Sequence, residues 1–292
     1  MDDPRPPHQQ ARDVDAPAQD SDYHAADEFF GGYPALSVLS LSLLWILGYQ
    51  LGISFLGEKM DSVYLPILLS AGVFHLLNPW LFLRRQATPL LESLRIGLPR
   101  GSQVFWLTLL TLCLLPTIEL LTQFNTQLVP VPEGFEEFLE GIIPHSGADW
   151  ALACTALVLI APLGEEVVFR GFMQQAARAS IGPLRASVGI GVFFSLIHLQ
   201  PHHVIPLAFL GIALCLVFER TGNLLASVWI HALYNGVGLL MAATLGDMEP
   251  EIPSPLLAGT AAISLGLAAL AYSQLRNEQP WTLDREEEKP AE

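Results

Sequence analysis

The residues of this chain best suited to chemistry are a few polar side chains that stand inside strongly apolar sequence. They are Glu165, Glu166, Arg170, His198, His231 and Asn235. An ionisable side chain in the middle of a bilayer costs at least about 2.5–3.5 kcal/mol on insertion scales, so each such residue calls for a partner or a function. Two carboxylates, an arginine, two histidines and an asparagine from three different apolar segments therefore indicate a site within a membrane.

Helical spacing predicts how these side chains are arranged. Glu166 and Arg170 are four residues apart, so they can form an ion pair on one helix face. Glu165 points about 100° away from Glu166 and can face a cavity while Arg170 neutralises its neighbour. His231 and Asn235 are also four residues apart and present two polar groups on one stripe.

A carboxylate, two histidines and an asparagine suit the activation of water. The carboxylate would act as general base, and histidine and asparagine would donate hydrogen bonds to the oxyanion of a tetrahedral intermediate. One glutamate and two histidines can also form a three-ligand zinc site, here Glu165, His198 and His231. The chain has no His-Glu-x-x-His sequence, and Asn235 would be an unusual ligand. We therefore expect no obligatory metal, with zinc or another divalent ion as the alternative.

The elements that position these residues follow from where charge and apolar residues lie. Apolar residues make up 51% of the 292 and charged residues only 15%, yet the net charge is −15; an ordinary soluble domain carries roughly 25% charge. The excess acid lies largely at the two ends, so residues 1–33 are predicted to be a disordered acidic tail and 274–292 a polar tail. Residues 34–273 are predicted to be a transmembrane domain. The acidic balance argues against nucleic-acid binding, which needs a basic face.

The expected fold is an all-α polytopic membrane bundle of about eight helices. The predicted spans are 34–56, 62–83, 104–121, 150–167, 187–200, 204–218, 223–242 and 255–273. Basic connections (84–103, 168–186, 219–222) alternate with acidic ones (122–149, 243–254). By the positive-inside rule, this alternation places both termini in the cytoplasm. The runs 187–200 and 204–218 are short and could form a tight pair or partly re-entrant helices.

Several connecting residues carry further expectations. Residues 171–180 are amphipathic and are predicted to lie along the cytoplasmic interface, and 133–149 to form a helix on the outer surface. His202 and His203 are expected to be solvated at an outer turn, and His75 to be an interhelical or interfacial polar group. On this plan Glu165 and His198 lie near opposite ends of their spans, so they meet only if a helix tilts or the fourth span continues beyond Arg170.

Three motifs in order resemble the CPBP family of CAAX-protease and bacteriocin-processing (ABI) intramembrane endopeptidases. They are GEEVVFRGF at 164–172, FFSLIHL at 193–199 and HALYN at 231–235, within a core of 150–242. The resemblance implies an eight-helix fold and a glutamate-dependent peptidase whose cavity opens to the cytoplasm. It assigns Glu165 as general base, with His198 helping to hold the water. His231 and Asn235 would form the oxyanion site, and Glu166 and Arg170 would be supporting residues.

The resemblance also implies partners and a location. Eukaryotic members of the family cleave prenylated CAAX proteins, and some bacterial relatives are linked to bacteriocin maturation or self-immunity. The expected substrate is thus a membrane-associated protein or peptide, prenylated in the CAAX case, within a bacterial plasma membrane and without nucleic acid. The family has been described both as metalloproteases and as metal-independent glutamate proteases. Two other functions remain open: a non-catalytic membrane scaffold or immunity protein on the same fold, and a proton-coupled transporter.

Overall fold

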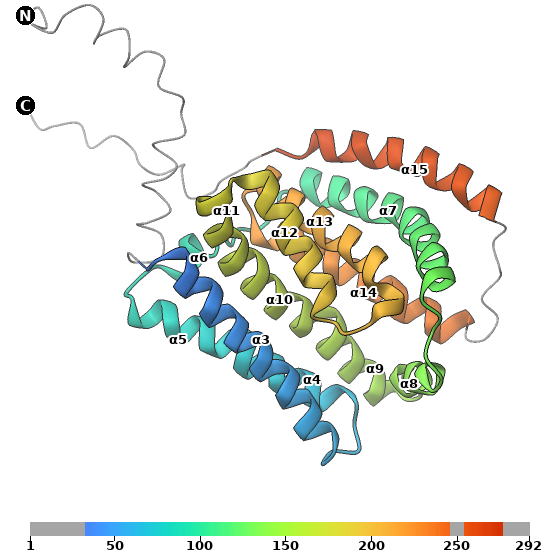
Figure 1. Cartoon of the computed structure of the whole chain (residues 1–292), viewed down its shortest axis with the longest axis horizontal. Coiled ribbons are helices and arrows are strands. Elements are labelled where there is room, and N and C mark those ends of the chain that lie inside the picture. Colours follow the sequence, from blue (N-terminus) through green and yellow to red (C-terminus); the bar gives the residue numbers. More distant parts are fainter. Residues whose placement is uncertain (1–32, 246–253, 277–292) are drawn as a thin grey trace, which may run out of the picture.

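A computed structural model of the chain describes residues 33–245 and 254–276 (Figure 1). The predicted tails 1–33 and 274–292 lie almost wholly outside these residues. Every element in the described part is helical, which confirms the all-α prediction. The elements are α3 (Ala35–Gly57), α4 (Tyr64–Ser70), η1 (Ala71–Leu77), α5 (Asn78–Arg85), α6 (Leu90–Ser93), α7 (Gly101–Leu128), α8 (Phe135–Ile142), α9 (Gly147–Ala153), η2 (Cys154–Ile160), α10 (Ala161–Glu166), η3 (Val167–Gln174), α11 (Gln175–Ile181), α12 (Pro183–Leu196), η4 (Pro201–His203), α13 (Val204–Thr221), α14 (Leu224–Leu245) and α15 (Ser254–Gln274).

The described residues contain seven helical runs that are long and apolar enough to cross a bilayer. Their outer surfaces are apolar, as lipid contact requires. Helix α3, for example, buries the small polar Ser42 completely and leaves Leu44 64% and Leu51 61% exposed. Small residues face inward in membrane helices because they allow neighbouring helices to approach closely. The chain is therefore a multi-pass integral membrane protein.

The fifth of the eight predicted spans, 187–200, corresponds to the short helix α12, which is not among these seven. Its 14 residues reach only about 21 Å at 1.5 Å per residue, less than the roughly 30 Å of a bilayer core. It packs closely against α13, which confirms the tight pair. A Cβ atom on Gly191 would lie 2.5 Å from the backbone nitrogen of Ile212, and one on Gly211 would lie 2.5 Å from the carbonyl oxygen of Gly191. The two backbones are in direct contact.

This contact makes the effect of a methyl group on α12 strongly dependent on position. We expect Gly191→Ala to lower the melting temperature of the purified protein, because backbone atoms of α13 cannot move aside without separating the helices. Gly189→Ala is the matched control, since nothing lies within 4 Å of its Cβ position. Alanine also favours a helix over glycine by roughly 0.5–1 kcal/mol, so Gly189→Ala should melt at or above the wild-type temperature. Equal melting temperatures for both variants would contradict the direct backbone contact.

The fourth span differs from its predicted end at residue 167. The helix runs without a break from Gly147 to Ile181, 35 residues, through the π-helical segments η2 and η3. The prediction that 171–180 lies along the membrane interface is wrong, because residues 171–177 are buried. Amide side chains allow this burial: Gln174 donates to the carbonyl oxygen of Cys215 (3.0 Å), and Gln175 to that of Ser93 (3.2 Å). Glu165 thus lies in the middle of a long helix instead of at its end.

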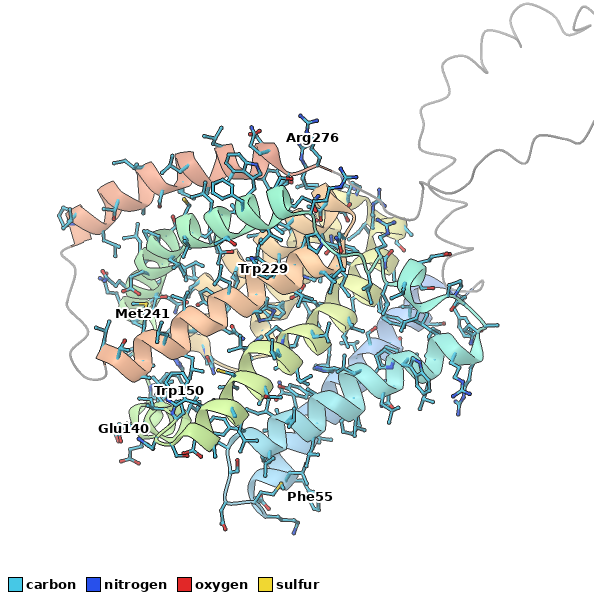
Figure 2. The ribbon with its side chains drawn as sticks, turned by 180° about the vertical axis from the view of Figure 1, so that it is seen from behind. Phe55, Glu140, Trp150, Trp229, Met241 and Arg276 are labelled. Atoms are coloured by element: carbon cyan, nitrogen blue, oxygen red, sulfur yellow. The ribbon has the colours of Figure 1, made fainter. Side chains whose placement is uncertain are left out.

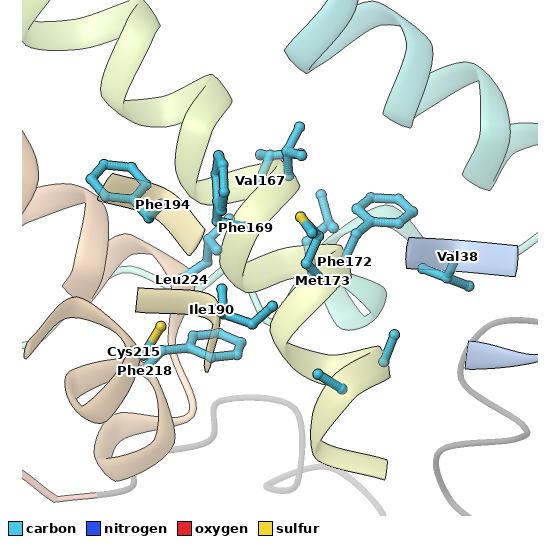
Figure 3. Close-up of a cluster of buried hydrophobic side chains, with 14 of the residues drawn as sticks. Val38, Val167, Phe169, Phe172, Met173, Ile190, Phe194, Cys215, Phe218 and Leu224 are labelled. Atoms are coloured by element: carbon cyan, nitrogen blue, oxygen red, sulfur yellow. The ribbon is translucent and has the colours of Figure 1, made fainter. Parts of the chain in front are cut away.

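This long helix runs through the centre of the bundle, between α3–α5 on one side and α12–α14 on the other (Figure 1). Its apolar face forms much of the main core. Phe169 and Phe172 are both completely buried, and Phe194 of α12 and Phe218 of α13 are 1% exposed (Figure 3). The aromatic packing fixes η3 against α12, since the rings of Phe169 and Phe194 lie 5.2 Å apart and nearly perpendicular.

The charged connections gather at opposite ends of the bundle. At one end Arg220 donates to the carbonyl oxygen of Leu275 (2.8 Å), Arg178 pairs with Glu219 (3.2 Å), and Gln103 donates to the carbonyl oxygen of Arg276. Figure 2 shows Arg276 at this end and Glu140 of α8 at the other. The separation agrees with the predicted alternation of basic and acidic connections. The orientation in the membrane, with cytoplasmic termini, stays a prediction.

The turn between α12 and α13 corrects one further expectation. His202, predicted to be solvated, is only 3% exposed, while His203 is half-buried. Phe135, the first residue of α8, covers His202 with ring centroids 4.4 Å apart. Helix α8 confirms helical structure within 133–149, and its packing on η4 is the reason that His202 loses contact with solvent.

Candidate active site

The centre of the candidate site is a buried cluster of three charged or titratable side chains. One oxygen of Glu166, Oε1, accepts hydrogen bonds from Arg170 Nη1 at 2.9 Å and from His231 Nδ1 at 2.8 Å. Arg170 also donates through Nη2 to the carbonyl oxygen of Gly211 at 2.9 Å. Glu166 and Arg170 are completely buried. The predicted ion pair therefore forms, and it joins the long central helix to α13 and α14.

Glu166 determines which nitrogen of His231 is available. An ionised carboxylate only accepts hydrogen bonds, so His231 Nδ1 carries a proton and Nε2 is the nitrogen left for chemistry. His231 Nε2 lies 3.8 Å from Glu165 Oε2. Glu165 is 8% exposed, and in the described part of the chain no side chain or backbone group donates a hydrogen bond to its carboxylate. The site thus places the Glu165 carboxylate 3.8 Å from Nε2 of an imidazole that a second carboxylate, Glu166, orients.

His198 is oriented by the backbone of its own helix end. Its Nδ1 donates to the carbonyl oxygen of Phe194 at 2.7 Å, which leaves Nε2 free. The buried ring of Phe194 lies against both histidines, with centroids 4.7 Å from His198 and 5.7 Å from His231. The turn that carries His198 is held from α3, because Gln50 Nε2 donates to the carbonyl oxygen of Ile197 at 3.0 Å.

Asn235 is tied to the long central helix. Its Nδ2 donates to the carbonyl oxygen of Leu157 at 2.9 Å. That oxygen is available because of the π-helical register, in which the backbone N–H of Ala161 donates five residues back, to Ala156. In the same register the carbonyl oxygen of Leu157 would accept from the N–H of residue 162. Residue 162 is a proline and has no N–H. One N–H and the side-chain oxygen of Asn235 remain for a ligand, and its predicted oxyanion role stays a prediction.

The structure brings Glu165, Glu166, Arg170 and His231 into one contiguous cluster, and Phe194 connects His198 to it. Among residues 33–245 and 254–276, no three His, Cys, Asp or Glu side chains converge as metal ligands would. The alternative zinc set of Glu165, His198 and His231 therefore does not fit a three-ligand site in this arrangement. Whether the protein needs a metal stays a prediction.

Two residues beside the site were not predicted to belong to it. The sequence indicates Phe194 only as part of the motif FFSLIHL, and it indicates His75 only as an interhelical or interfacial polar group. His75 is 1% exposed and its ring lies 4.2 Å from that of Tyr49. A Cβ atom on Gly164, the residue before Glu165, would lie 2.8 Å from the Cβ atom of His75. A glycine directly before a buried glutamate is the sequence signal that a neighbouring helix approaches there.

Comparison with known families supports the predicted resemblance over the core of the bundle. Residues 147–237 match the family model described as type II CAAX prenyl endopeptidase Rce1-like, and this segment contains all six predicted site residues. No curated protein and no solved structure matches the chain significantly. The matched segment begins at the start of the long central helix and ends in α14, so it includes every element that contributes to the Glu166–Arg170–His231 cluster.

Proposed function

We propose that the chain, whose residues 147–237 match the Rce1-like CAAX prenyl endopeptidase family model, is an intramembrane endopeptidase that uses water activated at Glu165. The observation that carries this proposal is the unequal environment of the two adjacent glutamates. Glu166 is neutralised by Arg170 and bonded to His231, whereas Glu165 has no hydrogen-bond donor among the described residues. Of the two carboxylates, Glu165 is the one free to take a proton from water.

In the proposed reaction, Glu165 removes a proton from a water molecule as the oxygen attacks the carbonyl carbon of the scissile peptide bond. The proton then passes to the amide nitrogen, the C–N bond breaks, and a carboxylate and an amine leave. His231 Nε2, 3.8 Å from Glu165, can share that proton, and the Glu166 carboxylate stabilises the imidazolium that forms. His198 and the remaining N–H of Asn235 are the groups available to hold the water and the oxyanion.

The proposed substrates are membrane-associated proteins or peptides. Glu165 lies at the middle of a 35-residue apolar helix, so a soluble protein without a membrane anchor would not reach it. The description of the matched family names prenylated CAAX proteins, which makes a farnesylated or geranylgeranylated C-terminal peptide the first substrate to test. The proposal also includes prenylation of the substrate, a location in a bacterial plasma membrane and a link to bacteriocin processing.

The test is cleavage by the purified protein in liposomes. A panel of membrane-anchored peptides would include one CAAX sequence in farnesylated and unmodified forms, with products identified by mass spectrometry. We expect cleavage of an anchored peptide by the wild type and none by Glu165→Ala or His231→Ala. Cleavage that survives in Glu165→Ala would overturn the mechanism. A wild type that cleaves no peptide but moves protons across the liposome membrane would favour the transporter alternative instead.

A further inference from the structure

His75 is a buried histidine whose two ring nitrogens are both without a hydrogen-bond partner among the described residues. It lies in η1, outside the segment that matches the family. A neutral imidazole has one donor and one acceptor, and buried polar atoms in folded proteins nearly always have partners. An exception that is 1% exposed and lies beside a candidate active site calls for a functional explanation.

The position of His75 is fixed from two directions. The ring of Tyr49 in α3 covers one side at 4.2 Å. On the other side, Gly164 allows η1 to approach α10 so closely that any side chain at residue 164 would collide with His75. Helix α3 is itself held tightly to this segment, since a Cβ atom on Gly48 would overlap the ring of Phe74 and one on Gly52 would lie 2.6 Å from Ser70 Oγ. His75 is therefore held against Gly164, the residue that precedes Glu165 in the chain.

Three of the elements packed against η1 carry charged groups. They are α5 with Arg84 and Arg85, both exposed, α10 with Glu165 and Glu166, and η3 with Arg170, while α3 and α4 contribute Tyr49 and Tyr64. Glu166 and Arg170 bond to each other and to other groups, as described above. Tyr49 contacts His75 through its ring. The Glu165 carboxylate is thus the neighbouring charged group that has no hydrogen-bond donor in the described part of the chain.

We propose that His75 is a positioning residue for Glu165: its imidazole hydrogen-bonds, through a water molecule, to the carboxylate and orients it towards His231. The inference rests on the proposed function, since it assigns His75 to the same site. It extends the site beyond the family segment, because the α3–α5 region then supplies a residue to it. A histidine used for packing alone would gain nothing from its two unpaired nitrogens.

Substitution by phenylalanine separates the two roles of His75. His75→Phe keeps an aromatic ring against Tyr49 and a side chain against Gly164, but it removes both nitrogens. We expect the purified variant to remain folded, with a melting temperature close to that of the wild type, because the aromatic ring keeps its packing against Tyr49. In the liposome assay, kcat should fall at least tenfold while KM changes less than twofold, and His75→Asn, which retains a donor near the Nδ1 position, should recover part of the loss. A His75→Phe variant with wild-type kcat would overturn the proposal.

A double-mutant cycle tests the same contact without any substrate. Melting temperatures would be compared for His75→Phe, Glu165→Gln and the double variant. If His75 and Glu165 share hydrogen bonds, the shift of the double variant differs from the sum of the two single shifts; additive shifts would overturn the proposal. The cycle also separates this inference from the proposed function. Non-additive shifts in a protein that cleaves none of the peptides would leave the His75–Glu165 contact standing and reject the peptidase.

Discussion

Replacing Arg170 by alanine will lower the free energy of unfolding by about 3–5 kcal/mol, the usual cost of leaving one partner of a buried ion pair uncompensated. Arg170 is completely buried and bonds in two directions, to the Glu166 carboxylate and to the backbone of Gly211. Its guanidinium also lies 4.9 Å from the centre of the Phe194 ring. Without it, Glu166 retains a negative charge that no water can reach. Unfolding in mixed detergent micelles, followed by circular dichroism, measures the loss.

Arg178→Ala is the matched control for Arg170→Ala. Both arginines lie on the same long helix and both pair with a glutamate, but the Arg178 side chain is 34% exposed. Exposed pairs contribute about 0–1 kcal/mol, so this variant should unfold close to the wild type. Arg170→Lys should not recover the stability, because a single ammonium cannot bond to Glu166 and Gly211 in two directions as a guanidinium does. Similar losses at Arg170 and Arg178 would show that the Glu166 pair is not the anchor of this helix.

The second large effect is on the reaction: Glu165→Gln will abolish most of the activity and leave the fold intact. A positioned general base contributes about 10²- to 10⁴-fold to a rate, and glutamine cannot take the proton from water. Stability should hold or rise, because the substitution replaces a nearly buried carboxylate that has no donor among the described residues. Initial cleavage rates in liposomes and melting temperatures in detergent measure the two effects.

Glu166→Gln, at the neighbouring position, should affect both stability and activity. The glutamine oxygen can accept one hydrogen bond from Arg170, but the charge that balances the guanidinium is lost and His231 Nδ1 loses its anionic acceptor. We expect both the melting temperature and the cleavage rate to fall. If Glu166→Gln lost activity at the wild-type melting temperature and Glu165→Gln lost stability, the roles assigned to the two glutamates would have to be exchanged.

The sequence was sufficient for the parts of the site that depend on spacing along one helix. Glu166 and Arg170 were predicted to pair because they are four residues apart, and they do. Most membrane helices were predicted because an apolar run of sufficient length specifies a span whatever it packs against. The predicted end of the fourth span at residue 167 is wrong. The polar amides of Gln174 and Gln175 are typical of a segment that lies along the membrane interface. They are buried because backbone carbonyls of other elements accept their hydrogen bonds.

The other features of the site depend on contacts between residues that are distant in the chain, and spacing along the sequence does not reveal such contacts. Three backbone carbonyls position the site, those of Leu157, Ile197 and Gly211, and a carbonyl has no signature in the sequence. The short length of α12 depends on its backbone contact with α13 through Gly191 and Gly211. Likewise, the place of His75 beside the site depends on the glycine at 164 and the packing of η1 against α10.

In the proposed mechanism Glu165 supplies chemistry and not substrate binding. The most direct measurement is therefore kcat and KM for Glu165→Gln and for the wild type, in liposomes, on one peptide that the wild type cleaves. We expect a fall in kcat of about 10²-fold or more, as follows from the loss of a general base, with KM within a few-fold of the wild type. A kcat within tenfold of the wild type, or a loss confined to KM, would contradict this mechanism.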